Sequence, residues 1–292
     1  MNILVTGANG QLGSEIKRLS KQVHSHIFTF VDIDEMDLTS ESSILSFLRT
    51  GTWDIIVNCA AYTAVDKAET DPAMAYAINS ESAKIIAEYS TENNITLIHI
   101  STDFVFDGKG NEPIGEDHEP NPINVYGKSK LEGEKHIQAR MPNAYIIRTS
   151  WLYSSFGNNF VRTIIRLANE RSALNVVYDQ IGTPTYAGDL AKAIMKIVDN
   201  ISNKVKDYPG VYHYSNEGVA SWYDLAHRVV DYLRLDCRIN PVTSEEYKAA
   251  AARPKFSVLS KRKIKETLGA EIPHWSTSLI ACLEELKKGS GR

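Results

Sequence analysis

The chain has 292 residues, of which 43% are hydrophobic and 23% charged, and its formal net charge is -4. These values are typical of a soluble globular protein with one large or two small domains, and they exclude a disordered chain or a fibre. A mildly acidic chain has no general attraction for nucleic acid or an anionic membrane. Three widely spaced cysteines without a CxxC pair argue against a disulfide framework or a zinc site. Because neither a signal peptide nor a membrane span is indicated, we expect a cytoplasmic protein.

Short apolar runs alternate with helical runs through the first half of the chain. The apolar runs predict strands at residues 2–6, 26–31, 54–57, 96–101 and 145–150. Helical spacing predicts helices at residues 11–20, 42–48, 73–93 and 125–140. In the less regular second half we predict helices at 160–169, 189–198, 222–233 and 278–288, a strand at 211–215, and a polar stretch with a helical centre at 241–255. Strands separated by helices predict an α/β fold with a parallel sheet covered on both faces.

A glycine-rich loop follows the first predicted strand and opens the first predicted helix. It has the spacing GxxGxxG, with Gly7, Gly10 and Gly13. Gly7 allows a tight turn, Gly10 a close approach of a pyrophosphate, and Gly13 close packing of helix on sheet. Since the N–H groups of the helix start can bind phosphate, the loop predicts a nucleotide site rather than a simple turn.

Asp32 ends the second predicted strand, where a carboxylate can accept hydrogen bonds from the adenosine ribose. It would also repel a 2′-phosphate, which favours NADH over NADPH. Asp34 could play the same part, and either residue could instead be an ordinary turn aspartate. Small residues after the third strand would let a cofactor lie across the strand ends. The remaining residues expected near the adenosine or along this edge are Asp37, Leu38, Ala60 and Ala61.

A YxxxK motif, Tyr126 and Lys130, opens the helix that follows the fourth strand. Residues four apart share one helix face, so both side chains can reach one site. An ammonium near the phenol would lower its pKa, and Lys130 could also bind the nicotinamide ribose. Ser101 and Thr102 end the fourth strand, where a hydroxyl can hold a substrate carbonyl. The alternative is a half-buried tyrosine beside a solvated lysine.

Two later residues have the right chemistry for a sugar nucleotide. Trp151 follows the fifth strand and could cover a sugar or nicotinamide ring, or could be a core tryptophan. The Arg253 guanidinium could form two hydrogen bonds with a diphosphate, or it could be a surface charge. The histidines show no metal-binding spacing such as HExxH.

Longer motifs along the whole chain resemble the extended short-chain dehydrogenase/reductase family, and within it the reductases that catalyse the last step of dTDP-L-rhamnose formation. The motifs are NILVTGANGQLG at 2–13, VNCAAYTAVDKAE at 57–69, HISTDFVFDG at 99–108, NVYGKSKLEGEK at 124–135, RTSWLY at 148–153, GNNFV at 157–161, DQIGTPT at 179–185, SWYDLA at 221–226 and ARPKFSVL at 252–259. The resemblance implies a Rossmann doubly wound sheet in residues 1–150. It implies a smaller α/β substrate domain in 151–292, with segments that return to the sheet.

The resemblance also implies an activity: NADPH- or NADH-dependent reduction of the C4 keto group of a dTDP-linked sugar. Tyr126 would deliver the proton, Thr102 would hold the oxygen, and Lys130 would tune Tyr126. The implied cofactor contacts are Gln11, Leu12, Asp32, Asp37, Leu38, Ala61, Tyr62 and Thr63, with Ser101 beside them. The implied substrate contacts are Val65, Thr102, Asp103 and Trp151. The expected partner is a small nucleotide sugar, with no nucleic acid and no membrane, and the chain is expected to be a monomer or homodimer.

Two departures from the family pattern affect these expectations. Phe104 stands where many members have tyrosine, so a sugar contact through that hydroxyl is missing. Some members hold a divalent metal between subunits with three glutamates. Glu15 and Glu285 match two of them, but Gly188 occupies the third position, so we expect no metal.

Two other functions remain open from the sequence. One is an epimerase or dehydratase of the same fold, which recycles a tightly held NAD. The other is a dinucleotide-binding regulatory subunit, as for methionine adenosyltransferase. The complete set of Thr102, Tyr126 and Lys130 favours an enzyme, and Asp103 has no glutamate directly after it, as a dehydratase would require.

Overall fold

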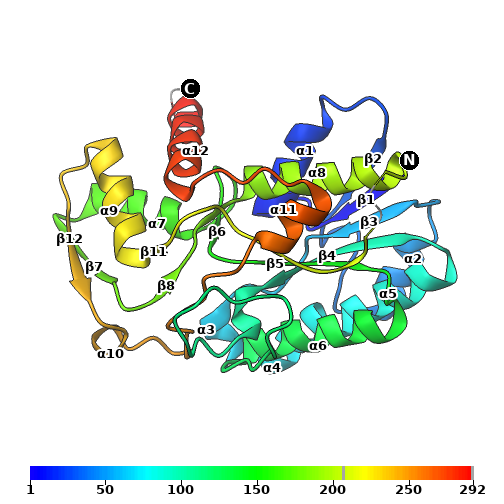
Figure 1. Ribbon diagram of the computed structural model, residues 1–292, viewed down its shortest axis with the longest axis horizontal. Helices are drawn as coiled ribbons and strands as arrows, with labels where there is room; N and C mark the ends of the chain where they lie inside the picture. The colour runs from blue at the N-terminus through cyan, green and yellow to red at the C-terminus, as the bar shows by residue number, and fades with distance from the viewer. Residues whose placement is uncertain (206–207, 291–292) are drawn as a thin grey trace.

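The computed structural model describes the backbone of residues 1–205 and 208–290, with side chains described up to residue 288. Its centre is a six-stranded parallel sheet with strand order β10-β5-β4-β3-β1-β2 (Figure 1). The strands are β1 (Asn2–Thr6), β2 (Ile27–Val31), β3 (Ile55–Asn58), β4 (Thr96–Thr102), β5 (Tyr145–Thr149) and β10 (Gly210–Tyr214). The predicted α/β fold with a parallel, doubly wound sheet is confirmed.

Helices cover both faces of this sheet (Figure 1). One layer contains α1 (Gln11–Ser20), α8 (Ala187–Ser202) and α11 (Arg262–Leu268), and the other contains α2 (Glu41–Leu48), α5 (Ser82–Glu92) and α6 (Val125–Arg140). Ile3 and Val5 of β1 pack with the first layer, whereas Leu4 packs with the second. Because alternate residues point to opposite faces and both faces are covered, the strands are mostly apolar, and the polar residues that they carry are buried.

A second lobe, on the left of Figure 1, is built around the parallel pair β7 (Ala173–Val177) and β12 (Arg238–Val242). Its apolar core is shared by α7 (Phe160–Glu170), α9 (Trp222–Leu233) and α12 (Trp275–Ser290). Short strands line its junction with the sheet: β6 (Leu152–Tyr153), β8 (Ile181–Gly182), β9 (Thr185–Tyr186) and β11 (Ala220–Ser221). The sequence pattern did not predict these two-residue strands, which are too short for a clear period, and it also missed the five-residue strands β7 and β12.

The helix predicted over 73–93 differs from the structure. It consists of α4 (Pro72–Tyr76), a π-helical turn η1 (Ala77–Glu81) and α5. Within the wide turn, the Asn79 carboxamide accepts from the Tyr62 N–H (2.9 Å) and donates to its C=O (3.1 Å). Gly133 of α6 packs directly on the Asn79 carbonyl, where a Cβ would come within 2.2 Å. The π turn thus fixes the loop after β3, consistent with the frequent occurrence of such turns near functional sites.

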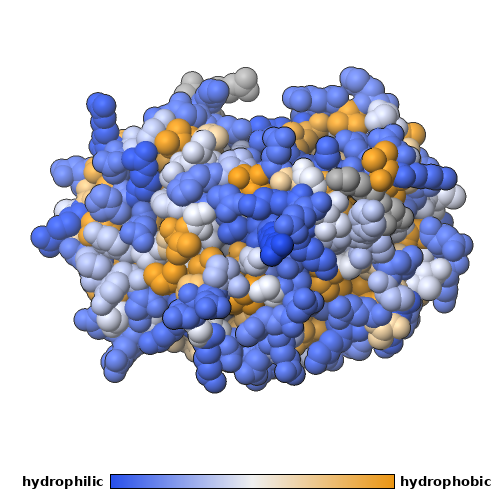
Figure 2. All heavy atoms as spheres, in the orientation of Figure 1, coloured by the Kyte–Doolittle hydropathy of each residue, from blue (hydrophilic) through white to orange (hydrophobic). Residues whose placement is uncertain are grey.

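Hydrophilic residues cover most of the face drawn in Figure 2, and hydrophobic residues appear between them in separate patches. Among the described residues, no helix combines the length and the apolar character needed to cross a membrane.

Candidate active site

The glycine loop joins β1 to α1 with no room for side chains. Gly7 has a φ of +64°, and a Cβ there would lie 2.8 Å from the Ala60 backbone at the end of β3. A Cβ on Gly13 would lie 2.2 Å from the Gly7 carbonyl oxygen. The loop therefore brings the N-terminus of α1 directly against the ends of β1 and β3, as a phosphate-binding turn requires.

A cavity of about 360 Å³ lies beside this loop. Its lining includes several residues that the sequence pointed to: Gly7, Asp32, Asp37, Leu38, Ala60 and Ala61. Asp34, the alternative to Asp32, is not among the lining residues. Nearby, the Gln11 Oε1 atom is buried without a hydrogen-bond partner among the described residues. A glycine cradle, an apolar pocket with carboxylates and an unpaired amide together fit the adenosine half of a dinucleotide.

The carboxylates of this cavity are held by backbone groups. Asp32 accepts from the N–H groups of Asn9 (2.7 Å) and Ile33 (2.9 Å). Asp37 accepts from both the N–H and the hydroxyl of Thr39, which lowers its pKa below the usual value. The cavity lining, among the described residues, contains no lysine or arginine that could bind a 2′-phosphate.

Thr102 and Tyr126 meet at the carboxyl end of β4. The Thr102 side chain lies near enough to the Tyr126 phenol to lower its pKa slightly, and it donates to Asp103 Oδ1 (3.2 Å). Tyr126 is 9% exposed and packs in a small apolar cluster with Tyr62, Val65 and Phe104. Burial raises the pKa of Tyr126 to about 12, and Asp103 adds to the increase.

Lys130 lies one turn after Tyr126 but is turned toward the sheet. Its Nζ donates to the Ile100 carbonyl (2.7 Å) and lies 3.3 Å from His99 Nε2. Burial lowers the pKa of Lys130 to about 8. The sequence predicted that this ammonium lowers the Tyr126 pKa, but Lys130 is not among the groups that shift it in this structure, and burial of the phenol raises that pKa.

Several predicted cofactor contacts have other partners through their side chains. The Ser101 hydroxyl donates to the Glu134 carboxylate, which also pairs with Arg148 (2.7 Å). Leu12 packs in the hydrophobic core beneath the sheet. At Thr63 it is the backbone carbonyl that is engaged: it accepts from the Val65 N–H (2.9 Å) as α3 (Val65–Ala68) begins. At Leu12 the backbone, rather than the side chain, is thus available to a ligand.

A larger cavity of about 1030 Å³ occupies the second lobe. Arg253 lines it, together with apolar and polar residues of α7, β7 and α10 (Ser244–Tyr247). The Arg253 guanidinium is engaged by Asp66 (2.6 and 3.1 Å), which lowers the pKa of that carboxyl. The remaining predicted substrate residues, Val65, Thr102, Asp103 and Trp151, are not among the residues that line this cavity.

Trp151 stacks on Trp222, a cavity residue that sequence reasoning did not single out. Trp151 has a φ of +48°, which is unusual for a bulky residue and is typical of strained functional sites. Its ring also fills the space beside Gly182, where a Cβ would come within 2.7 Å.

Ser257 is a second residue that the sequence did not point to individually. Burial raises the pKa of Asp103 to about 7, and the Ser257 side chain lies near enough to this carboxyl to oppose the increase. The Ser257 backbone N–H donates to Ile181 (2.8 Å), so β8 and the segment at 251–257 are joined at the site. The only signal in the sequence was the motif at 252–259, which the resemblance included without assigning a role to this serine.

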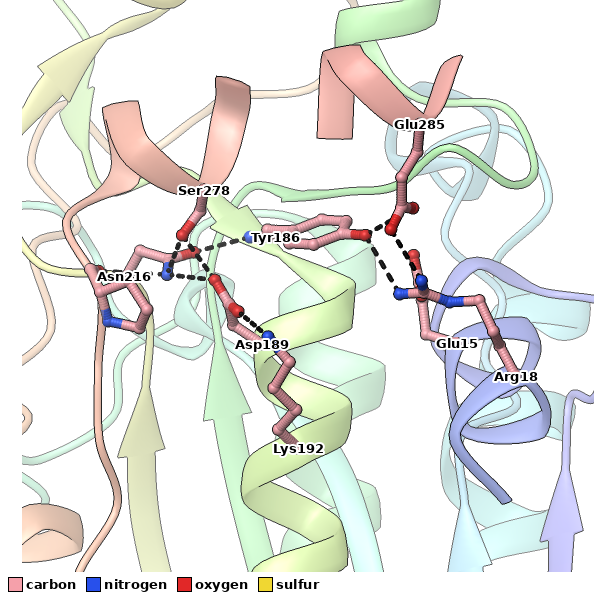
Figure 3. A network of polar contacts seen from close by, with 9 residues as sticks. Glu15, Arg18, Tyr186, Asp189, Lys192, Asn216, Ser278 and Glu285 are labelled. Atoms are coloured by element: carbon pink, nitrogen blue, oxygen red, sulfur yellow. Dashed lines mark hydrogen bonds and ion pairs between the residues drawn. The ribbon is translucent and has the colours of Figure 1, made fainter. Parts of the chain in front are cut away.

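The two glutamates that match the family's metal ligands lie in a separate polar cluster (Figure 3). Arg18 joins them, with Nη2 at 2.7 Å from Glu15 and Nη1 at 2.7 Å from Glu285. Beside Gly188, the Tyr186 ring occupies the space that a longer side chain would need, and its hydroxyl donates to Glu285 (2.8 Å). As they are arranged, these residues do not fit a divalent metal, because the Arg18 guanidinium already lies between the two carboxylates and pairs with both.

Comparisons with known proteins agree with this geometry. The model of the RmlD substrate binding domain family matches residues 1–288. The spore coat polysaccharide biosynthesis protein SpsK of Bacillus subtilis (strain 168) is 41% identical, with 97% of each chain covered. A crystal structure of a dTDP-4-dehydrorhamnose reductase from Clostridium acetobutylicum has a TM-score of 0.93 at 40% identity, and covers 98% of this chain and 100% of its own. That of a Bacillus anthracis dTDP-4-dehydrorhamnose reductase in complex with NADP has a TM-score of 0.91 at 38% identity, covering 97% and 99%.

Proposed function

Because the chain belongs to the RmlD substrate binding domain family, we propose that it reduces the C4 keto group of dTDP-4-dehydro-β-L-rhamnose to give dTDP-L-rhamnose for cell-surface polysaccharide synthesis. The observation that carries the proposal is the Thr102–Tyr126 pair at the carboxyl end of β4, in the same parallel sheet whose β1 leads into the glycine loop. It combines a proton donor and a hydroxyl at the strand ends where a dinucleotide fits.

When bound, NADPH or NADH supplies the hydride. Tyr126 donates a proton to the oxygen of the keto group as that oxygen gains negative charge. A phenol with a pKa of about 12 is protonated at neutral pH, and it is still more acidic than the alcohol that forms. Thr102 steadies the same oxygen, and Lys130 holds the nicotinamide ribose. Gly7, Gly10, Gly13 and the N–H groups after them hold the pyrophosphate.

The second lobe binds the sugar nucleotide. Its cavity has room for a nucleoside diphosphate and presents an indole, that of Trp222, for stacking with a ring. Arg253 binds the diphosphate after exchanging one of its contacts with Asp66. Val65, Asp103 and Trp151 contact the sugar between this cavity and Tyr126.

The test is a turnover assay with freshly prepared dTDP-4-dehydro-β-L-rhamnose. We expect continuous loss of NADPH or NADH absorbance and formation of dTDP-L-rhamnose, identified by NMR. An epimerase or dehydratase would change the sugar without consuming reduced cofactor. A regulatory subunit would bind dinucleotide, consume none, and co-purify with a methionine adenosyltransferase.

The proposal includes a cytoplasmic location and a monomer or homodimer. The three cysteines are free thiols, as in a reducing compartment. Light scattering of the purified protein measures the oligomeric state directly.

A further inference from the structure

Three polar residues form a row across three neighbouring strands. Thr6 of β1 is the register partner of Asn58 of β3, and Asn58 is the register partner of His99 of β4. All three side chains are 1% exposed. Register partners in a parallel sheet point to the same face, so the side chains follow one another beneath α6. Such a buried row, at the carboxyl ends of β1 and β3, is costly unless every group is hydrogen-bonded.

The row ends on Lys130. Thr6 donates to Asn58 Oδ1 (2.7 Å), Asn58 Nδ2 lies 3.1 Å from His99 Nδ1, and His99 Nε2 lies 3.3 Å from Lys130 Nζ. Lys130 is itself 1% exposed. Three other groups face it: the Ile100 carbonyl, the Glu134 carboxylate from its own helix, and the Cys59 thiol that follows β3.

An ammonium has three N–H donors. One goes to Ile100 and one points at His99, so one remains for a ligand or for the phenol. The imidazole therefore determines the direction of the last donor. It can do this only if its Nε2 carries a lone pair when Lys130 is charged, because two N–H groups cannot face each other.

We propose that His99 is a positioning residue for the reduction, acting through Lys130, and that the Thr6–Asn58–His99 row reverses its hydrogen bonds when Lys130 loses its proton. With Lys130 charged, His99 is protonated on Nδ1 and donates to the Asn58 oxygen. With Lys130 neutral, His99 is protonated on Nε2, and the Asn58 NH₂ group donates to Nδ1. A half-turn of the Asn58 amide exchanges the two arrangements, since the Thr6 hydroxyl can donate or accept.

The surroundings of His99 make this exchange possible. Burial and the nearby lysine keep the His99 pKa well below its usual value, so the ring stays neutral and only its tautomer changes. Burial also lowers the Lys130 pKa to about 8, within reach of ordinary buffers, while Glu134 and Cys59 oppose that decrease.

The inference rests on the proposed function, since Lys130 is a catalytic residue there, but its first test needs no substrate. In ¹⁵N-histidine-labelled protein, we expect the His99 signal, assigned by its loss in His99→Gln, to change from the Nδ1–H to the Nε2–H tautomer as pH rises through the Lys130 titration. A His99 ring that keeps one tautomer across that range, or that becomes charged near neutral pH, would overturn the inference and leave the proposed activity standing.

The second test is kinetic. Gln at position 99 keeps an acceptor for Lys130, so His99→Gln should retain kcat within about threefold, whereas His99→Leu should lower kcat at least about tenfold with KM little changed. Loss of the acceptor disfavours the ammonium, so the fall in activity at high pH should move to lower pH in His99→Leu. If activity in His99→Leu falls at the same pH as in the wild type, the inference is contradicted.

A matched control is available at His26, which is also buried and lies 3.4 Å from Asp199, away from the row. His26→Gln should leave unchanged the high pH at which activity falls. If His99→Leu does not fold, Thr6→Val can be used instead, since it removes only the hydroxyl at the far end of the row. In this variant the His99 tautomer should change at a different pH from that in the wild type. An unshifted tautomer change would contradict the inference.

Discussion

The indoles of Trp151 and Trp222 lie face to face, with ring centroids 3.7 Å apart and planes within 5° of each other. Trp151 comes from the crossing between the sheet and the second lobe, and Trp222 begins α9. Trp222 also donates to Gln180 Oε1 (3.1 Å) and touches Phe160. The pair connects the large cavity of the second lobe to the end of the sheet.

Removal of this stacking should weaken substrate binding more than chemistry. In Trp222→Ala, Trp151 loses the surface that holds its strained backbone, and we expect KM for the sugar nucleotide to rise about tenfold, with a smaller change in kcat. Trp53→Phe is the control, because Trp53 stacks on Phe47 outside the cavity. If KM in Trp222→Ala is no higher than in Trp53→Phe, the stack has no part in substrate binding.

Tyr126→Phe should abolish reduction while the fold and cofactor binding remain. Without the phenol hydroxyl, the group proposed to transfer the proton is lost and only the much less acidic Thr102 hydroxyl remains at the keto oxygen, so we expect kcat to fall by at least about a hundredfold. Fluorescence titration with NADH should give a Kd close to that of the wild type. Turnover at the wild-type rate would refute the role of Tyr126.

Asp103 should make stability depend on pH in an unusual direction. Burial raises its pKa from 3.8 to about 7, so the folded state binds a proton that the unfolded state releases. Its contribution is therefore most favourable below about pH 4 and is lost as pH rises to about 7. Asp103→Asn removes this dependence. At pH 8 we expect the variant to have a higher Tm than the wild type and a free energy of unfolding that is larger by about 2 kcal/mol. Thermal unfolding of both proteins from pH 5 to 8 provides the measurement, and parallel curves would contradict the prediction.

The cofactor cavity should prefer NADH to NADPH. Two carboxylates, Asp32 and Asp37, line it, and its described lining has no cation. Asp32→Ser removes the charge nearest the ribose edge, so the ratio of the two Kd values should shift toward NADPH by about tenfold. Asp34→Ser, outside the lining, should leave the ratio unchanged. Tighter binding of NADPH than NADH by the wild type would show that the backbone contacts of Asp32 let it tolerate a 2′-phosphate.

Arg18 should stabilise the contact of α12 with α1. Glu15 is fully buried, and Arg18→Met would leave its charge with the Ser154 hydroxyl (2.7 Å) as its one side-chain hydrogen-bond partner among the described residues. We expect a loss of about 2 kcal/mol in unfolding free energy, largely restored by adding Glu15→Gln. Denaturant unfolding of the single and double variants measures this coupling. A double variant no more stable than Arg18→Met would show that the buried charge is not the cause.

The local features of this protein were readable from its sequence. Apolar runs and helical spacing predicted the strands of the sheet and most of the helices, with α1, α6 and α9 at their observed bounds, whereas α11 was not predicted and the helix expected over 73–93 is divided by a π turn. The glycine loop and YxxxK were recognisable because each requires particular residue types at fixed spacing within one element. The residues proposed for catalysis and cofactor binding come largely from such local patterns.

Only the tertiary structure decided which side chains face one another across strands and lobes. Strand register places Thr6, Asn58 and His99 in one row, and no spacing along the chain shows that alignment. Burial, which depends on the whole fold, makes Tyr126 a weaker acid, although the neighbouring lysine alone predicted the opposite. The Trp151–Trp222 stack joins segments from different elements for the same reason: contacts between distant residues are set by how elements pack, and packing has no local signature.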